Sequence, residues 1–203
     1  MKNDVFDIII AFVKAAKKGD RYIESEFNNE THKIWGVNYL LNQILRQLDI
    51  PKERLLVSKE AQKLWEQIMG DEDINDYYYR YVVTAKLSGA TIAEYKGASK
   101  TPTSTRVLEA GKSSFTFNDV FHEEHVVPIA VIIDELKKLK DEDLDYEHVD
   151  AILRHIYICR MLKSEDRKIT EKYKRSFDKD EVIEQIYHNH DIFLVGEEWI
   201  YNK

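Results

Sequence analysis

The chain has 203 residues, of which 43% are hydrophobic and 11% aromatic, with 7 glycines and 3 prolines. This composition is typical of an ordered, helix-rich globular protein with one mid-sized domain or two small ones, and it excludes disordered and fibrous classes. The net charge of −7 argues against generic nucleic-acid binding, because phosphate contacts need lysine and arginine.

Two further features narrow the class. The longest apolar run, residues 8–13, is too short to span a bilayer. The single cysteine, Cys159, excludes an intrachain disulfide and a cysteine-rich zinc site, and it fits a buried strand position without a catalytic role. We therefore expect a cytoplasmic protein with no membrane partner.

The charged residues are unevenly distributed. Residues 141–150 contain six acidic side chains. Six basic residues occur from Arg80 to Lys112 and seven from Arg160 to Arg175, so the two basic stretches lie on either side of residues 124–125. They are either solvated faces of helices or phosphate contacts of a nucleic-acid-binding surface.

Helical periodicity dominates the first 75 residues. Asn3 and Asp4 are expected to cap a helix that ends near residues 17–19, where two lysines precede a glycine. A second helix is predicted over residues 31–48, and a third begins after Ser58 and stops at Gly70. The acidic residues 71–73 predict a boundary between an N-terminal helical region, 1–75, and a second region, 76–203.

The second region alternates short strands and helices. Helices are predicted at residues 76–87, 104–110, 129–139, 146–154 and 180–188, and one more begins at Ser164 as its cap. Extended segments are predicted at residues 115–120, 156–159 and 191–201. The expected fold class is a mostly helical α+β protein.

The most informative segment is residues 122–128, His-Glu-Glu-His-Val-Val-Pro. Two histidines three residues apart could bind a metal on a helix, but the spacing is not the His-Glu-x-x-His of zinc proteases. Pro128 also argues against a helix that continues through His125. On an extended chain, His122 and Glu124 face one side while residues 123 and 125 face the other.

Three segments of the chain resemble the HNH (ββα-metal) nuclease superfamily. They are residues 124–128, Glu-His-Val-Val-Pro, residues 156–159, and the Ser-Glu-Asp-Arg-Lys sequence at 164–168. The resemblance covers about residues 115–169. It implies a ββα-metal-like core and a Mg²⁺ or Mn²⁺ ion. It further implies that Glu124 is a metal ligand, that His125 is the general base, and that Asp166, or Glu165 before it, is the ligand from the helix.

The chain departs from the family pattern in two places. The asparagine usual on the helix is replaced by Glu165 and Asp166, and the linker at residues 129–155 is longer and more helical than in the compact motif. An acidic residue can still bind Mg²⁺, which accepts oxygen ligands of either type. In this interpretation Arg167 or Lys168 neutralises charge on the phosphate.

The expected function is a metal-dependent DNA endonuclease used in restriction or phage defence, with a second copy or a partner protein as a possible companion. Basic residues near the motif are the candidate DNA contacts: Lys96, Lys100, Arg106, Lys112, Lys163 and Lys168. The alternatives are a non-catalytic interaction module, such as a DNA-mimicking inhibitor or complex subunit, and another metal-dependent hydrolase. The remaining histidines, His148, His155, His188 and His190, are interpreted as structural or surface residues.

Overall fold

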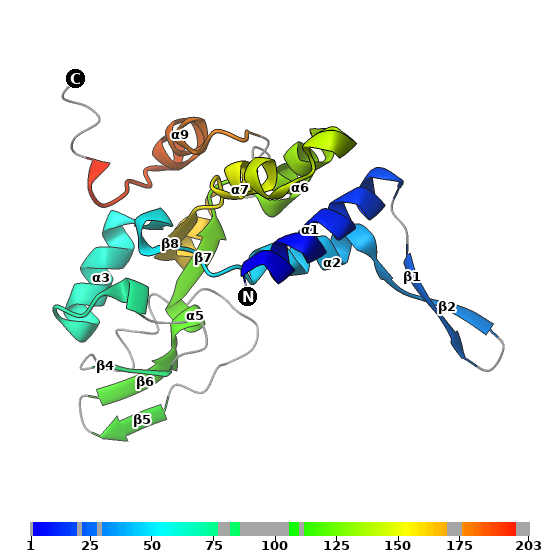
Figure 1. The fold of residues 1–203 in the computed structure, drawn as a ribbon. Helices are drawn as coiled ribbons and strands as arrows, with labels where there is room; N and C mark the ends of the chain where they lie inside the picture. The colour runs from blue at the N-terminus through cyan, green and yellow to red at the C-terminus, as the bar shows by residue number, and fades with distance from the viewer. Residues whose placement is uncertain are drawn as a thin grey trace. The chain divides into compact units, whose positions relative to one another are not determined.

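The computed structural model describes residues 2–19, 22–27, 30–76, 82–85, 106–109, 112–169 and 176–197, and it shows a mostly helical α+β fold (Figure 1). The chain divides into two compact units. Unit 1 contains residues 1–50, 127–156 and 174–179, and unit 2 contains residues 51–126, 157–173 and 180–203. Each unit is thus assembled from segments that are distant in sequence.

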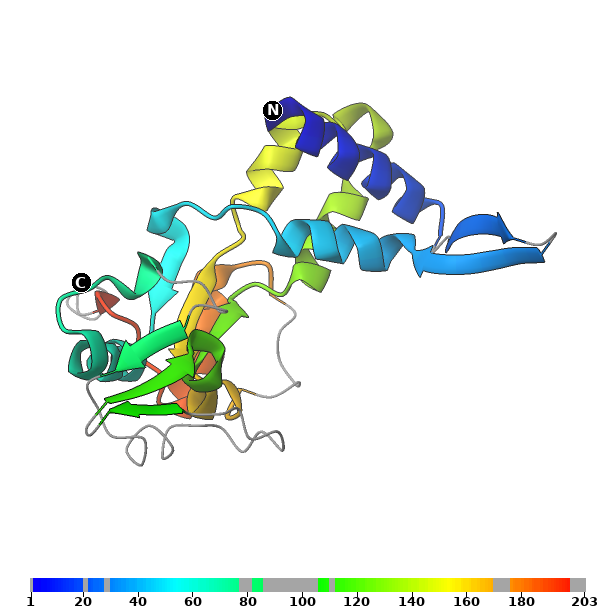
Figure 2. The same ribbon diagram turned by 90° about the horizontal axis from the view of Figure 1, so that it is seen from below.

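The described residues of unit 1 form four helices and a protruding β-hairpin (Figures 1 and 2). Its helices are α1 (Lys2–Lys17), α2 (Val37–Arg46), α6 (Ile129–Lys138) and α7 (Tyr146–Leu153). The hairpin pairs β1 (Tyr22–Phe27) with β2 (Glu30–Gly36) in antiparallel register, and the 3₁₀ turn η3 (Asp141–Asp143) precedes α7.

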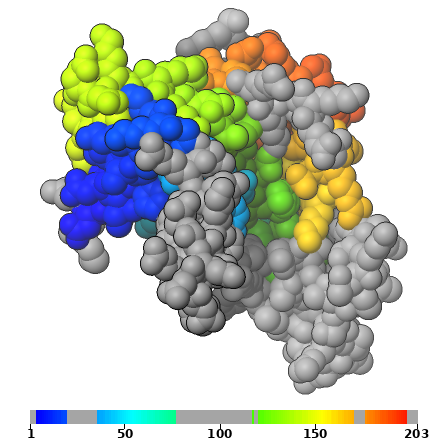
Figure 3. Space-filling view, turned by 90° about the vertical axis from the view of Figure 1, so that its right-hand side faces the viewer, coloured from blue at the N-terminus to red at the C-terminus, as the bar shows by residue number. Residues whose placement is uncertain are grey.

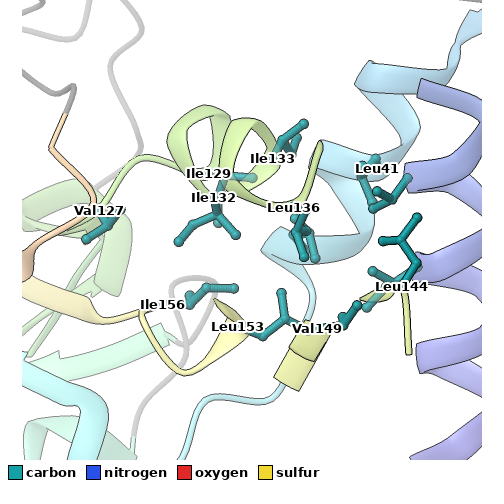
Figure 4. Close-up of a cluster of buried hydrophobic side chains, with 13 residues drawn as sticks. Leu41, Val127, Ile129, Ile132, Ile133, Leu136, Leu144, Val149, Leu153 and Ile156 are labelled. Carbon is teal, nitrogen blue, oxygen red and sulfur yellow. The ribbon is translucent and has the colours of Figure 1, made fainter. Parts of the chain in front are cut away.

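The core of unit 1 lies between these helices. Figure 4 shows isoleucine, leucine and valine side chains from α2, α6 and α7 pointing toward one another. The core also takes Ile9 and Val13 from α1, both fully buried, so each helix contributes its apolar face. Lys17 ties the end of α1 to η3, because its Nζ donates to the carbonyl of Leu139 and to Asp141 Oδ1, at 2.6 Å in both cases.

In the part of unit 2 that the structure describes, there are two three-stranded sheets. In the first, β3 (Leu55–Val57) is parallel to β8 (Ile158–Leu162), and β8 is antiparallel to β7 (Phe121–His125). The second sheet has the order β4-β6-β5 and is antiparallel throughout; its strands are Val82–Ala85, Lys112–Thr116 and Arg106–Glu109.

Short helices complete unit 2. The turn α5 (Phe117–Val120) joins β6 to β7, and α8 (Lys163–Asp166) follows β8 directly. The others are listed in chain order: η1 (Lys52–Arg54), α3 (Lys59–Met69), η2 (Ile74–Asp76), α9 (Lys179–Val182, whose first residue belongs to unit 1), the π-helical turn η4 (Ile183–Tyr187) and η5 (His188–His190).

The β3-β8-β7 sheet has a core cluster on each face. Phe121 and Leu162 belong to the cluster formed with α3, where the Trp65 ring meets Phe117 and Phe121 edge-on, with centroids 5.9 and 5.6 Å away. Cys159 and Met161 belong to a second cluster, formed with η4 and with Ile169 after α8. Because side chains alternate along a strand, β8 supplies both clusters.

The serine that caps α3 also forms a hydrogen bond with a residue of α8. Ser58 is fully buried, and its Oγ accepts a hydrogen bond from the Ala61 backbone N–H at 3.1 Å. The same hydroxyl donates to Glu165 Oε2 at 2.6 Å, and that oxygen also accepts from the N–H of Leu162 at 2.8 Å. One serine and one carboxylate therefore join the start of α3 to the start of α8.

Helices with strong periodicity are confirmed. α1, α3, α6 and α7 lie where the sequence predicts them, with the predicted Ser58 cap and Gly70 stop on α3. The predicted cap of α1 is wrong, because the helix begins at Lys2 and Asn3 and Asp4 lie in its first turn. The helix predicted near residues 180–188 is present as α9 and η4. In the described part of the chain, no helix is long and apolar enough to cross a bilayer.

Several predicted helices are instead strands. Residues 31–36 of the predicted second helix lie in β2, so that helix begins only at Val37. Residues 82–85, predicted as helix, form β4, while residues 77–81 and 86–87 of that prediction lie outside the described residues. The helix predicted at 104–110 is replaced by β5 in its described part, 106–109. In each case pairing with a neighbouring strand outweighs the local helical pattern.

Other boundaries are also corrected. Residues 117–120, predicted as extended, form α5, because Phe117 and Val120, three apart, are both buried on one side of a turn. Ser164 lies inside α8 and is not its cap; the cap residue is Leu162, whose N–H binds Glu165. The closing strand predicted from residue 191 is reduced to a bridge between Ser58 and Leu194, and residues 198–201 lie outside the described residues.

Replacing Ser58 with alanine should lower the free energy of unfolding by about 2 kcal/mol or more, since it removes a helix cap and a donor to a buried carboxylate. The measurement is a urea unfolding curve. The control is Ser164→Ala, which makes the same change at an exposed position in α8 and should alter stability by less than about 0.5 kcal/mol. Equal losses in the two variants would contradict the structural role of Ser58.

Candidate metal centre

The pairing of β7 with β8 brings together three side chains of unit 2 whose types can bind a metal. The register runs from Phe121 opposite Leu162 to His125 opposite Ile158. Since side chains alternate along a strand, His122 and Glu124 share one face of β7. Asp166, at the end of α8, lies against the same face, because α8 follows β8 directly and packs on β7.

The three side chains are close enough to bind one ion. His122 Nε2 lies 3.2 Å from Glu124 Oε2 and 3.6 Å from Asp166 Oδ1. One donor atom from each residue lies within 4.8 Å of the other two, and all three residues are partly buried. Donors that share a divalent ion at about 2.1 Å lie roughly 3 to 4 Å apart, so this spacing suits a metal.

The donor set indicates which metals would fit. Two carboxylates offer the hard oxygen ligands that Mg²⁺ and Mn²⁺ prefer, and one imidazole favours transition metals over Mg²⁺. Two carboxylates held this close also need a compensating positive charge, which either a cation or a protonated His122 would supply. The residues present therefore fit a divalent ion, with Mn²⁺ favoured over Mg²⁺.

The opposite face of β7 is held by a buried arginine. Arg160 Nη2 donates to Glu123 Oε1 at 3.1 Å, and another of its N–H groups donates to the Ile74 carbonyl. Its guanidinium also lies over the Phe117 ring, 5.4 Å from the centroid, and burial lowers its pKa. These contacts hold β7 from the side away from the three donors.

Glu165, the alternative ligand to Asp166, lies elsewhere. Its carboxylate is buried and accepts hydrogen bonds from Ser58 and Leu162. Burial raises the pKa of Glu165 above its ordinary value, against the opposing effect of the hydrogen bond from Ser58. Glu165 therefore connects α8 to α3, while Asp166, the next residue, lies beside His122 and Glu124.

His125 is the last residue of β7 and is partly buried. The β7–β8 register has no bulge, so alternation places His125 on the face opposite Glu124. Among the described residues, the group able to hold a metal contains His122 in addition to the predicted Glu124 and Asp166, and it does not contain His125.

The predicted phosphate contacts are spread over unit 2. Arg167 and Lys168 are exposed just after α8, and Lys163 is half-buried at its start. Arg106 begins β5 and Lys112 begins β6. Lys96 and Lys100 lie outside the described residues.

Two features of unit 2 were not assigned from the sequence. The sequence places His122 on the same side of an extended chain as Glu124 but does not assign it as a ligand, although this two-residue spacing was the available signal. Tyr187, on the π-helical turn, is fully buried, and its hydroxyl has no hydrogen-bond partner among the described residues. Burial raises the pKa of this hydroxyl, with smaller electrostatic effects from Cys159 and Asp166, so it stays protonated.

A scan against protein-family models found no match for this chain, and searches of curated proteins and of solved structures found none either.

The purified protein should bind one Mn²⁺ ion, and bind it more tightly than Mg²⁺, because His122 adds a nitrogen donor to two carboxylates. Isothermal titration with each metal measures this. Asp166→Asn should weaken Mn²⁺ binding at least about tenfold by removing one charged ligand. The control Asp71→Asn, at an exposed position after α3, should bind as the wild type does. Equal binding by both variants would remove Asp166 from the site.

The pH dependence of stability should reveal the buried Glu165. Its folded-state pKa lies above the ordinary value of 4.5, so just above that pH the folded protein keeps a proton that the unfolded chain has released. Stability from this group is therefore lost as the pH rises through that window. The wild type should lose stability relative to Glu165→Gln as the pH rises above about 4.5 in urea unfolding. Exposed Glu53→Gln serves as the control, and the opposite slope would contradict the assignment.

Proposed function

We propose that this protein is a metal-dependent DNA endonuclease of the HNH (ββα-metal) type. The observation that carries the proposal is the convergence of His122, Glu124 and Asp166 on β7 and α8. Two antiparallel strands followed by a helix, with acidic ligands on the first strand and on the helix, is the arrangement that the sequence resemblance implies. In this proposal β7, β8 and α8 are the ββα-metal core.

The long linker departs from the compact motif, and the division into units offers a reason. Residues 127–156, between β7 and β8, belong to the helical unit 1 as α6, η3 and α7. The two strands still pair in one uninterrupted register across this insertion. The insertion therefore lengthens the connection without separating the proposed ligands.

In the proposed reaction, water attacks a phosphodiester phosphorus. His125 takes the proton from the water as the new P–O bond forms, and the bond to the 3′-oxygen breaks to leave a 5′-phosphate. A bound divalent ion supplies positive charge for the leaving oxygen. Arg167 and Lys168, exposed after α8, contact the phosphate. His125 faces away from Glu124 along β7, so this role requires that the scissile phosphate bind past the end of that strand.

The rival proposal, a DNA-mimicking interaction module, depends on the acidic block at residues 141–150. Several of these carboxylates have local partners: Asp141 pairs with Lys17, Asp145 accepts from the His148 N–H as the cap of α7, and Asp150 pairs with Arg154. These hydrogen bonds and ion pairs within the chain explain much of the acidic block without a DNA-mimicking role. The nuclease is therefore the better-supported function.

The test is nicking of supercoiled plasmid by the purified chain in Mn²⁺ or Mg²⁺, with EDTA as the metal-free control. Activity should require metal, and Glu124→Gln and Asp166→Asn should each lower it at least about 100-fold, because each removes a charged ligand. Asp71→Asn is the matched control, since it neutralises an exposed carboxylate outside the site. Nicking that persists in Asp166→Asn or in EDTA would overturn the proposal.

Substitution of the two histidines of β7 should have different effects on metal binding and on nicking. His122→Asn should lose both Mn²⁺ binding and nicking, because His122 is placed as a ligand. His125→Asn should keep Mn²⁺ binding but lose about 100-fold or more of the nicking rate, as expected for a general base. Unchanged nicking in His125→Asn would assign the base to another group.

A further inference from the structure

Tyr187 carries a buried hydroxyl that the fold does not use. The side chain is fully buried, and its hydroxyl has no hydrogen-bond partner among the described residues. An unpaired buried hydroxyl destabilises a folded protein, so packing alone does not explain a tyrosine here, because phenylalanine has nearly the same shape. The hydroxyl is therefore a donor that is available to a nearby acceptor.

Tyr187 lies on the same side of the β3-β8-β7 sheet as the proposed metal ligands. It packs in the core cluster that contains Cys159 and Met161 of β8. In the antiparallel register these two residues are the partners of Glu124 and His122, so all four side chains lie on one face of the sheet. The segment that carries α8 (gold) and the segment that carries η4 (orange) are both visible on the face of the molecule drawn in Figure 3.

Asp166 approaches the same cluster from α8. Ile169 is buried in that cluster, and its N–H donates to the Asp166 carbonyl at 3.2 Å. Residues three apart in a helical turn lie on one side, so Asp166 borders the cluster that holds Tyr187. Burial raises the pKa of the Tyr187 hydroxyl, and nearby acidic groups, with Cys159 and then Asp166 first among them, raise it further. The hydroxyl thus keeps its proton and has a carboxylate in its neighbourhood.

The turn that carries Tyr187 has an unusual backbone. η4 is a π-helical turn, a rare structure that occurs frequently at functional sites. Its residues Ile183, Ile186 and Tyr187 are all buried, and the N–H of Ile192 donates to the Tyr187 carbonyl at 2.9 Å. Because these contacts hold the backbone and the ring, the partner of the hydroxyl has to be a side chain that can move towards it.

We propose that Tyr187 is a positioning residue for Asp166, and that its hydroxyl donates a hydrogen bond to the Asp166 carboxylate when a divalent ion is bound. This inference rests on the metal centre of the proposed function, but not on the nuclease reaction. Asp166 Oδ1 lies 3.6 Å from His122 Nε2, which is too long for a hydrogen bond, so His122 does not hold this carboxylate. A carboxylate that binds an ion commonly accepts a further hydrogen bond, and loss of that bond typically weakens metal binding about 10- to 100-fold.

Isothermal titration of Tyr187→Phe with Mn²⁺ tests the proposal. The variant should bind Mn²⁺ at least about tenfold more weakly than the wild type, because Asp166 loses its donor. The matched control is Tyr146→Phe, the same change at a 48% exposed tyrosine of unit 1, and it should bind as the wild type does. Equal affinities of the wild type and Tyr187→Phe would overturn the inference.

The same titrations, read beside the plasmid assay, separate this inference from the nuclease proposal. Unchanged binding by Tyr187→Phe in a protein that nicks DNA would reject the role of Tyr187 and leave the nuclease standing. Weakened binding in a protein that does not nick DNA would support the role of Tyr187 and reject the nuclease. A wild type that binds no Mn²⁺ would overturn both.

A double-mutant cycle shows whether Tyr187 acts through Asp166. In the Asp166→Ala background, Tyr187→Phe should change the Mn²⁺ affinity by less than about twofold, because the acceptor is already absent. Effects of the two substitutions that simply add would show that the hydroxyl acts on another group, and they would overturn the inference.

Stability in EDTA distinguishes this role from a purely structural one. Tyr187→Phe should have a urea midpoint no lower than that of the wild type, because it removes a buried hydroxyl that has no partner. The pH dependence assigned to Glu165 should also be unchanged, since Glu165 accepts from Ser58 and Leu162 instead. A lower midpoint or an altered pH slope would show that the hydroxyl serves the fold or Glu165, and would overturn the inference.

Discussion

The uninterrupted antiparallel register of β7 against β8 is the constraint on which unit 2 depends. It assigns each residue of β7 to one side of the sheet, so Phe121 and Glu123 meet the α3 core and Arg160, while His122 and Glu124 face the other way. It also sets where β8 ends and α8 begins, and hence where Asp166 lies. A shift of one residue would turn both proposed strand ligands into the α3 core.

The two consecutive acidic residues of α8, Glu165 and Asp166, lie in different surroundings and have different structural roles. Glu165 is buried and is held by Ser58 and by the N–H of Leu162, at a cost that shows in its raised pKa. Asp166 is only partly buried and lies 3.6 Å from His122. The first carboxylate anchors the short helix to α3, and this anchor positions the second. A helix of four residues has little stability alone, so such a contact is needed to hold it in place.

The candidate site was predictable in part, because two of its residues lie in segments whose sequence resembles the HNH nuclease superfamily. Glu124 and Asp166 could be proposed from their neighbours in sequence, and the structure brings them together. The role of His122 follows from strand alternation, which applies only once the segment is known to be a strand. Choosing between Glu165 and Asp166 required the position of Ser58, which lies 107 residues earlier in the chain.

The sequence by itself determined the long helices, because an apolar stripe at helical spacing and a local cap act within a few residues. The apolar stripe is present in α1, α3, α6 and α7, and a side-chain cap is added in α3 and α7. Only the tertiary structure decided the short strands β2, β4 and β5, since a strand is stabilised by a partner that local periodicity does not reveal. The same reason applies to the two units, in which burial joins residues 127–156 to the N-terminal helices and returns the chain to β8 beside β7.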